Sequence, residues 1–332
     1  MNELGFTTEM IIGRDVGVNF ALVSELAKQI GLDIKLDAAL GTLTTYRVGG
    51  KSKIEVIVRQ NEDLGLISQI VNQIDGLGLL VLGNGSNVLV SDDGYPGLVV
   101  RLSDNYAYEK FNDDVVEIGG SRALPIAARR IATKALAGFE WAVGVPGALG
   151  GAVRMNAGGH GSEISESLIC ANIYDFEQPS LGLSEISNNM LGLKYRHSVV
   201  TPTQIVINAK FRFKFGQKDD SLDKISRIVT WRRENQPGGQ NAGSVFVNPP
   251  GLSAGKIIED AGLKGSSYRT ATVSAKHANF IQAQPEGCAR DVHELMAIIR
   301  DTVMQKFGVR LRTEIRLVGF CDDYGLTSSE DY

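Results

Sequence analysis

The sequence predicts an α+β fold divided into several lobes, and three features of the chain support this prediction. Between residues 53 and 102 the expected order of elements is β-α-β-β-β, unlike the regular alternation of a doubly wound parallel sheet. A glycine-rich stretch at 144–161 interrupts the middle of the chain, and a long helical pattern at 290–307 lies near its end. The length of 332 residues allows two or three domains with a sizeable core.

The first expected lobe covers residues 1–104 and contains helices and strands. Leu22, Leu26 and Ile30 recur at helical spacing and indicate one buried stripe. Asn61 precedes a second helical pattern, where its side chain can cap the helix. The expected elements are a helix at 19–31, a strand at 53–58, a helix at 61–74 with Leu64, Ile67, Ile70 and Val71 on one face, and strands at 79–82, 88–90 and 98–102.

A second lobe is expected at 105–215 and a third at 216–311. The long helix of the third lobe places Val292, Leu295, Met296, Ile299, Val303 and Phe307 on one stripe. A final strand is expected at 311–318, and the polar, acidic tail at 321–332 is expected to fray. The other expected elements are strands at 115–118, 168–176 and 204–213 and helices at 124–136, 221–234, 253–261 and 290–307.

Composition excludes several classes of function. The net charge is −4 and the 34 lysines and arginines are dispersed, so a nucleic-acid partner has no electrostatic support. The three cysteines lie far apart, without metal-ligand spacing or a disulfide framework, which fits a reducing cytoplasm and predicts no metal site. No apolar run approaches about 18 residues and no secretory signal is present, so membrane spanning and secretion are not expected.

The most informative segment is 81–90, in which two apolar runs flank a turn of Gly, Asn and Ser. Gly83 and Gly85 permit backbone angles that other residues avoid, and the successive amide N–H groups of such a turn can hold an anion. Val88 replaces the third glycine of a dinucleotide-binding fingerprint, and a strand follows instead of a helix. The segment is thus either a phosphate-binding turn or an ordinary hairpin.

The glycine-rich stretch 144–161 almost lacks bulky side chains, so a flat ligand could lie directly against its backbone. Close packing of two backbone segments is the alternative, but it explains such a density of glycine poorly. Arg154 and His160 lie within the stretch, and each is either a ligand contact or a partly exposed side chain.

Three further segments could carry chemistry. Arg196, in the segment 195–198, offers a permanent charge and a rigid set of donors that suits a carboxylate or an oxyanion, although a surface salt bridge is the default interpretation. Ser244 follows a glycine in a turn-rich segment but has no nucleophile elbow. In the alternating segment 313–318, Glu314 and Arg316 would share one face, either as a salt bridge or as two groups aimed into a cleft. Lys256 lies on a short helix whose polar face is expected to be solvated.

Taken in order, these segments resemble the UDP-N-acetylenolpyruvoylglucosamine reductase (MurB) family of flavoenzymes from about residue 35 to 320. The short spacing after Tyr195 is similar to the family's shorter type, which lacks an inserted substrate-covering loop. The segments that carry the resemblance are 46–50, 82–87, 144–161, 195–198, 242–246 and 314–316.

The resemblance implies an FAD-binding fold of the vanillyl-alcohol-oxidase (PCMH) type in two lobes, with a third α+β lobe for substrate. On this basis, 1–104 is the first FAD-binding lobe, joined by the strand at 312–320, and 105–215 is the second. The substrate-binding domain is 216–311. The implied catalytic residues are Arg196, Ser244 and Glu314; the implied FAD contacts are Arg47, Gly49, Leu82, Gly83, Asn84, Gly85, Ser86, Asn87, Val145, Pro146, Gly150, Gly151, Asn156, Gly158 and Arg316; and the implied substrate contacts are Tyr195, Asn248 and Lys256.

The activity that the resemblance implies is NADPH-dependent reduction of an enolpyruvyl nucleotide sugar in peptidoglycan precursor synthesis, by a cytoplasmic enzyme that we expect to be a monomer. Hydride would come from N5 of reduced FAD and a proton from Ser244, while Arg196 and Glu314 would stabilise the negative charge of the intermediate. Glu314 can do so only when it is protonated or bridged by a donor. The alternatives are an FAD oxidase of an alcohol or sugar with the same flavin fold, and a nucleotide-sugar sensor without turnover.

Overall fold

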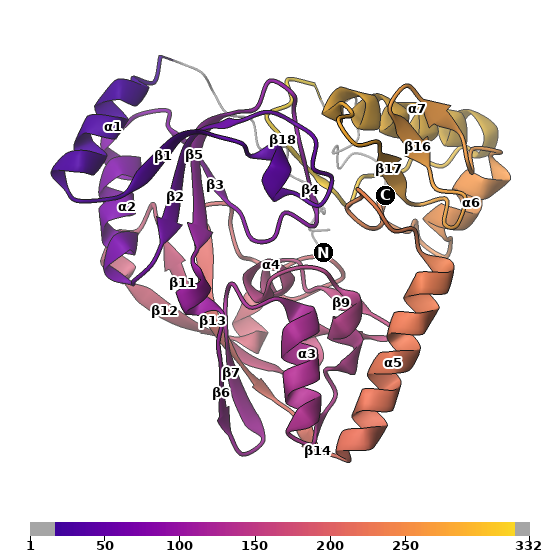
Figure 1. The fold of residues 1–332 in the computed structure, drawn as a ribbon, viewed down its shortest axis with the longest axis horizontal. Coiled ribbons are helices and arrows are strands. Elements are labelled where there is room, and N and C mark those ends of the chain that lie inside the picture. Colours follow the sequence, from indigo (N-terminus) through magenta and orange to yellow (C-terminus); the bar gives the residue numbers. More distant parts are fainter. Residues whose placement is uncertain (1–16, 323–332) are drawn as a thin grey trace, which may run out of the picture.

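A computed structural model describes residues 17–322 of the chain. In the view of Figure 1, a sheet with helices α1 and α2 lies above a second, longer sheet, and the segment that carries α6 and α7 lies beside the first. The helices are α1 (Phe20–Gln29), α2 (Glu62–Gln73), α3 (Leu124–Thr133), α4 (Leu149–Arg154), α5 (Lys218–Asn235), α6 (Ala254–Asp260) and α7 (Ala289–Phe307).

The first sheet has the order β1-β2-β5-β3 and combines both kinds of pairing. β1 pairs with β2 antiparallel, whereas β2 and β3 each pair with β5 in parallel. Helices α1 and α2 cover this sheet, and Leu64, Ile67 and Ile70 of α2 are buried as expected. The strands are β1 (Ile34–Ala38), β2 (Ser52–Val58), β3 (Gly78–Val81) and β5 (Tyr95–Leu102).

The segment 81–90 is not a hairpin, because its two strands pair with different partners. β3 pairs with β5, while β4 (Val88–Val90) pairs in parallel with β18 (Arg316–Val318). Leu89 lies opposite Leu317 in this pair, and both side chains are fully buried. The turn between β3 and β4 is therefore a crossover between two sheets, and the end of the described chain returns to it.

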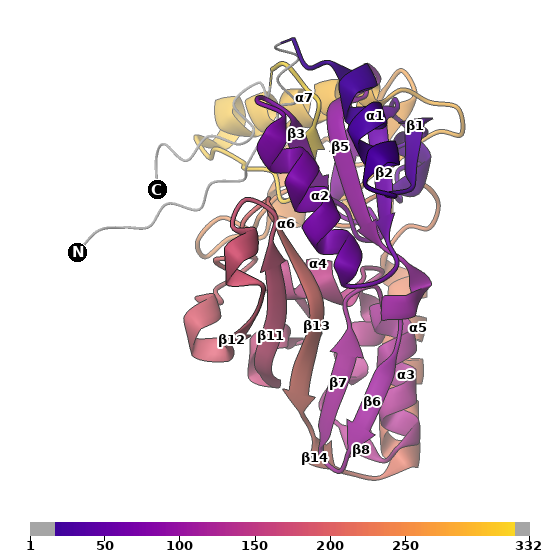
Figure 2. The same ribbon diagram turned by 90° about the vertical axis from the view of Figure 1, so that its left-hand side faces the viewer.

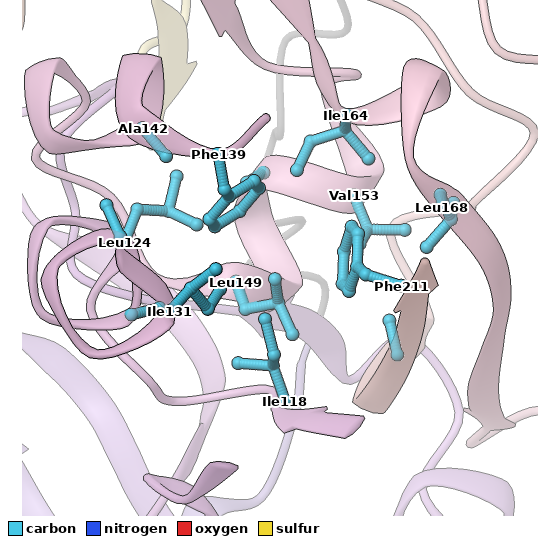
Figure 3. Close-up of a cluster of buried hydrophobic side chains, with 14 of the residues drawn as sticks. Ile118, Leu124, Ile131, Phe139, Ala142, Leu149, Val153, Ile164, Leu168 and Phe211 are labelled. Carbon is cyan, nitrogen blue, oxygen red and sulfur yellow. The ribbon is translucent and has the colours of Figure 1, made fainter. Parts of the chain in front are cut away.

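The second sheet is antiparallel, with the order β12-β11-β13-β7-β6 (Figure 2). Helices α3 and α4 and the long α5 cover one face, where Phe139, Leu149 and Phe211 meet in a large apolar cluster (Figure 3). Burial of such side chains is the main stabilising contribution to this part of the fold. The strands are β6 (Glu109–Asn112), β7 (Val115–Gly119), β11 (Leu168–Asp175), β12 (Leu183–Ser187) and β13 (Gln204–Arg212).

The other face of this sheet packs against the first sheet. Phe176 and Ile207 belong to the same buried cluster as Ile67 of α2. The buried Ser68 hydroxyl lies 3.1 Å from the Tyr174 hydroxyl, and Asn72 donates to Phe176 O at 2.8 Å. Helix α2 and the first sheet are thus joined to the second sheet by both apolar and polar contacts.

The segment after α5 forms a small three-stranded sheet against α6 and α7. Its core includes Val292, Met296 and Ile299 of α7 and continues into Leu89 and Leu317, so no solvent layer separates it from the β4–β18 pair. The remaining strands are β8 (Leu136–Ala137), β9 (Gly158–Gly159), β10 (Ser162–Glu163), β14 (Lys214–Phe215), β15 (Ser267–Tyr268), β16 (Ala271–Val273) and β17 (Ile281–Ala283).

Several local predictions are wrong. Leu22 is 42% exposed, and the buried positions of α1 are Val23 and Ala27, so the stripe lies one residue further along. Asn61 makes no side-chain cap. Instead, the Asp63 side chain accepts hydrogen bonds from Arg59 N and Gln60 N in the loop before α2. Phe307 is 44% exposed because it is the last residue of α7, just before the left-handed cap at Gly308.

The expected strand at 311–318 is shorter than predicted, since only Arg316–Val318 is strand. Before it, Thr313 makes an isolated bridge with Phe246, and the backbone bends at Glu314. Alternation of burial nevertheless persists: Ile315 and Leu317 are fully buried, whereas Glu314 and Arg316 are not. The part of the expected tail from residue 323 onward lies outside the described residues. No helix within residues 17–322 has the length and apolar character needed to cross a membrane.

Candidate functional site

A cavity of about 700 Å³ lies where the three parts of the fold meet. Its lining comes from the turn between β3 and β4, the glycine-rich stretch with α4, the turn that carries Arg196, the C-terminal end of α5, and the segments around Ser244 and Glu314. Such a volume matches the usual size of a small-molecule site. Within the described chain, Glu314 is the single carboxylate in its lining, against Arg154, Arg196, Arg232 and Arg316, so the cavity favours an anionic ligand.

The turn at 82–87 forms one wall of the cavity. Gly85 has φ +59°, and a Cβ there would come within 2.6 Å of Leu43 O, so only glycine fits. Gly85 O also accepts from Thr45 N at 3.1 Å, which fixes the turn against the preceding loop. The turn thus presents its backbone and short polar side chains to the cavity without any basic side chain of its own.

Asn87 connects this turn with the opposite wall. Its side-chain amide donates to Glu314 O at 2.9 Å, and its own carbonyl accepts from Arg316 N at 3.0 Å. The turn and the segment 314–316 are therefore fixed relative to one another by two hydrogen bonds on either side of Ile315.

Arg196 is presented by a tight turn. Lys194 and His197 exchange backbone hydrogen bonds, so Tyr195 and Arg196 occupy the two central positions. Arg196 has φ +54°, a conformation that costs free energy in a residue with a side chain and is typically retained at functional sites. The guanidinium also lies over the Tyr195 ring, 5.0 Å from its centroid.

Arg196 and Glu314 form a close ion pair inside the cavity. Arg196 Nε donates to Glu314 Oε1 at 2.7 Å, and Arg196 Nη2 donates to Gly158 O at 3.1 Å. The two side chains are only 24% and 14% exposed. Burial raises the pKa of Glu314 above the ordinary carboxyl value, and the charge of Arg196 and its hydrogen bond oppose this rise. The Arg196 guanidinium is thus the hydrogen-bond donor to Glu314, which is the condition under which this carboxyl could lie beside another negative charge.

Ser244 lines the same cavity from the third part of the fold. Gly243 before it has φ +78°, and the Asn241 side chain accepts from Gly243 N at 3.0 Å, so the turn is built locally. After it, Val245 and Phe246 are buried. Ser244 thus lies between a locally built turn and the core, in the lining of the cavity.

A smaller cavity of about 120 Å³ adjoins the large one. Both share Gly83, Asn84, Gly151 and Arg154 in their linings, so the two spaces lie next to each other. Gly150 lines only the smaller cavity. An elongated ligand could therefore extend from the large cavity into the small one.

Most of the residues expected at a site lie around these two cavities. The expected catalytic residues Arg196, Ser244 and Glu314 line the large cavity together. So do many of the expected FAD and substrate contacts, namely Leu82, Gly83, Asn84, Gly85, Ser86, Asn87, Val145, Pro146, Gly151, Gly158, Asn248 and Arg316.

Five expected contacts lie outside both linings: Arg47, Gly49, Asn156, Tyr195 and Lys256. Asn156 is fully buried and bonds Lys194 O and Ser165 N, so it supports the turn that carries Arg196. A Cβ at Gly49 would come within 2.3 Å of Val90 O, which indicates a packing role beside β4. Lys256 is paired with Asp260 on the exposed face of α6.

Sequence reasoning missed the contribution of α5, which was expected only as a helix at 221–234 of the third lobe, without a role in a site. Trp231, Arg232 and Gln236 line the cavity, and Arg232 Nε donates to Gln236 at 2.7 Å. Burial lowers the pKa of Arg232, because the charged guanidinium is partly withdrawn from water. The His160 ring meets Trp231 edge-on at 5.1 Å. The sequence pattern of α5 does not indicate that its end lines the cavity. Its position between the lobes does.

The cavity fits FAD. Gly151 lines both spaces, and a Cβ there would meet no protein atom within 4 Å, so protein packing does not require glycine at this position. The open space beside this glycine gives a flat ligand room to lie against the backbone. The backbone-lined turn 82–87 suits a pyrophosphate, and the excess of arginine in the lining suits its charge.

Comparisons with known proteins agree with this geometry. Residues 53–176 match the family described as FAD binding domain, and residues 235–318 match the family described as UDP-N-acetylenolpyruvoylglucosamine reductase, C-terminal domain. The first match spans parts of both sheets, and the second contains Ser244 and Glu314.

Relatives match over almost the whole chain. A UDP-N-acetylenolpyruvoylglucosamine reductase of Clostridioides difficile is 34% identical over 308 residues, which cover 92% of this chain and 98% of the relative. One of Lachnoclostridium phytofermentans is 36% identical over 309 residues, which cover 91% and 98%. The crystal structure of the Thermus caldophilus reductase (MurB) is 30% identical, with a TM-score of 0.73, and covers 86% of this chain and 98% of that chain. A berberine-bridge-enzyme-like protein of Physcomitrella patens, 12% identical with a TM-score of 0.54, shares the fold alone.

Proposed function

Because the chain belongs to the UDP-N-acetylenolpyruvoylglucosamine reductase family, we propose that Arg196, Ser244 and Glu314 carry its reaction in the large cavity. The fold is the α+β FAD-binding fold of the vanillyl-alcohol-oxidase (PCMH) type with an additional C-terminal domain. The protein is an FAD-containing, NADPH-dependent oxidoreductase that reduces UDP-N-acetylenolpyruvoylglucosamine to UDP-N-acetylmuramate in peptidoglycan precursor synthesis.

One observation carries the assignment of the catalytic residues. A guanidinium, a carboxyl and a hydroxyl, which come from three distant segments, line one cavity together with the glycine-rich turn 82–87. Arg196 and Glu314 are bonded to each other, and Asn87 ties Glu314 to the turn. A chance surface cluster would not be held by such a chain of buried contacts.

FAD, when bound and reduced by NADPH, supplies the hydride that the carbon–carbon double bond of the substrate accepts. Arg196 stabilises the negative charge that then develops on the substrate carboxylate, through its N–H groups that are not bonded to Glu314 or Gly158. Glu314 orients the guanidinium. Ser244 delivers the proton to the neighbouring carbon, so the double bond gains one hydride and one proton.

We also propose residues that hold the nucleotide part of the substrate. Arg232 lines the cavity, half withdrawn from water and without a carboxylate partner in the described chain, and it therefore suits a diphosphate. Trp231 beside it offers an exposed aromatic face. Asn248 also lines the cavity, and its side chain accepts from Ala254 N at 3.0 Å, at the beginning of α6.

The division of the chain into 1–104 with 312–320, 105–215 and 216–311 is part of the proposal. The parallel pairing of β18 with β4 and the separate antiparallel sheet of 109–212 support it. We further propose that the enzyme acts as a monomer, because Arg196, Ser244 and Glu314 meet at the cavity without needing a residue from a second copy, and that it acts in the cytoplasm, because the substrate is a polar nucleotide sugar.

Replacement of Ser244 by alanine tests the proposal. In stopped-flow absorbance, flavin reduction by NADPH should keep its rate, while reoxidation by the enolpyruvyl substrate should slow by about 10² or more, since the proton donor is lost. Ser184→Ala, on the edge strand β12, is the matched control and should leave both steps unchanged. Equal rates of reoxidation in Ser244→Ala and wild type would refute the role of Ser244, and rapid reoxidation by oxygen after reduction by a sugar would favour an oxidase.

A further inference from the structure

The carbonyl of Val245 is a junction between the segments that carry Ser244 and Glu314. It accepts from Glu314 N at 2.7 Å, and the Thr313 hydroxyl lies 3.1 Å from the same oxygen. Thr313 and Phe246 form the bridge between the two segments. The backbone after Ser244 is thus bonded directly to the backbone of Glu314.

Asn279 holds the other side of this junction. Its backbone carbonyl accepts from Val245 N at 2.8 Å, and its side chain both accepts from Phe246 N at 2.9 Å and donates to Phe246 O at 2.8 Å. Asn279 is only 4% exposed. Both peptide planes that flank Val245 are therefore bonded, and the contacts of Val245 O with Glu314 N and with the Thr313 hydroxyl join this junction to the segment of Glu314.

Thr313 is fully buried, outside the linings of both cavities, and yet bonded on both sides of Glu314. Its hydroxyl accepts from Ile315 N at 3.0 Å, and it lies 3.1 Å from Ile315 O as well as from Val245 O. A valine would fill the same space but would provide neither an acceptor for Ile315 N nor a donor for Val245 O. The hydroxyl therefore contributes hydrogen bonds that packing alone does not require.

We propose that Thr313 is a positioning residue, whose buried hydroxyl sets the placement of Ser244 relative to Glu314 and Arg196 through the Val245 carbonyl. This inference rests on the proposed function. Serine is a weak acid, so proton delivery depends on close placement, and a displacement of 1 Å can cost about 10² in rate. Thr313 touches neither the cavity nor the reacting atoms and acts only through its neighbours.

The test compares Thr313→Val with Thr313→Ser by stopped flow. Thr313→Val should reduce its flavin with NADPH at the wild-type rate but should be reoxidised by substrate about tenfold or more slowly, because Ser244 is displaced. Thr313→Ser keeps the hydroxyl and should restore reoxidation to within about twofold of wild type. Thr270→Val removes a hydroxyl that bonds Asp291 in the same lobe, away from the cavity, and should slow neither step.

A double variant separates positioning from general damage. If Thr313 acts through Ser244, then Ser244→Ala with Thr313→Val should be no slower in reoxidation than Ser244→Ala alone, whereas independent effects would multiply. Multiplying effects, wild-type reoxidation in Thr313→Val, or slow reoxidation in Thr313→Ser would each overturn the inference.

One outcome keeps this test distinct from that of the proposed function. Wild-type reoxidation in Ser244→Ala would refute the proton-donor role itself, whatever Thr313 does. If Thr313→Val fails to fold, as judged by circular dichroism, Thr313→Cys is the second variant, because a thiol has a similar size but donates weakly. It should show intermediate reoxidation, and a wild-type rate would again overturn the inference.

Discussion

Glu314 is a buried carboxyl whose pKa is raised by burial against the opposing effect of Arg196. Between the ordinary carboxyl pKa of about 4.3 and this raised value, the folded state holds a proton that the unfolded state releases. The free energy of unfolding should therefore fall as the pH rises through this window, and Glu314→Gln should not show that fall. Urea unfolding of both proteins at a series of pH values measures the difference.

Parallel slopes for wild type and Glu314→Gln in this series would contradict the raised pKa. Glu185→Gln is the matched control, because Glu185 pairs with Lys210 on an exposed strand edge. Its loss should leave the dependence above about pH 5 unchanged, since the pKa of Glu185 is lowered by Lys210.

At the scale of elements, the sequence predicted strands and helices well wherever periodicity reflects burial. Helix α2 is an example, because it buries one face of apolar residues, and the alternation of burial in 313–318 persists although only Arg316–Val318 is strand. It could not predict that β3 and β4 belong to different sheets, since pairing partners distant in the chain leave no local signal. The same limit applies to the candidate site: Trp231 and Arg232 became candidates only when α5 was placed beside the cavity.

Helix α5 is anchored at its beginning by Glu140. This carboxylate is 4% exposed and accepts from Ser221 at 2.7 Å and from Lys224 at 3.2 Å. Burial alone would raise the pKa of Glu140, but hydrogen bonds from Ser221, from backbone N–H groups and from Lys224 outweigh it and lower the pKa. The anchor fixes the helix whose other end brings Arg232 to the cavity.

Glu140→Gln should lower the free energy of unfolding at pH 7 by about 1–3 kcal/mol, since buried donors lose a charged acceptor. A lowered pKa contributes stability above the unfolded value of about 4.3, and this contribution is lost as the pH falls through the folded pKa. The deficit of the variant should therefore shrink in acid. Denaturant titrations at pH 7 and below pH 4 measure it, and a deficit that is constant with pH would contradict the explanation.

For the whole molecule, Asp92 connects parts of the fold that are far apart in sequence. From the turn after β4, it accepts from Ala289 N and Arg290 N at 2.9 Å each, at the beginning of α7, and from the Cys288 thiol at 2.7 Å. A carboxylate at a helix N-terminus satisfies free N–H groups and complements the helix dipole. Here the cap is supplied by another part of the fold.

Asp92→Ala should lower the free energy of unfolding by about 1–2 kcal/mol and raise the KM for the nucleotide sugar several-fold, because the third lobe is held less firmly against the first. Ser253→Ala is the matched control, since Ser253 caps α6 within its own lobe. It should cost comparable stability without changing KM. Thermal unfolding and steady-state kinetics measure both effects, and an unchanged KM in Asp92→Ala would argue against a role in placing the lobe.

The contact between Asn87 and Glu314 joins residues 227 positions apart. During translation, the ribosome releases the glycine turn long before the carboxyl that faces it exists. Strand β4 likewise cannot form its two-stranded sheet until β18 has been synthesised. A nascent chain therefore has no finished flavin pocket, and prosthetic-group capture becomes a late event in biogenesis.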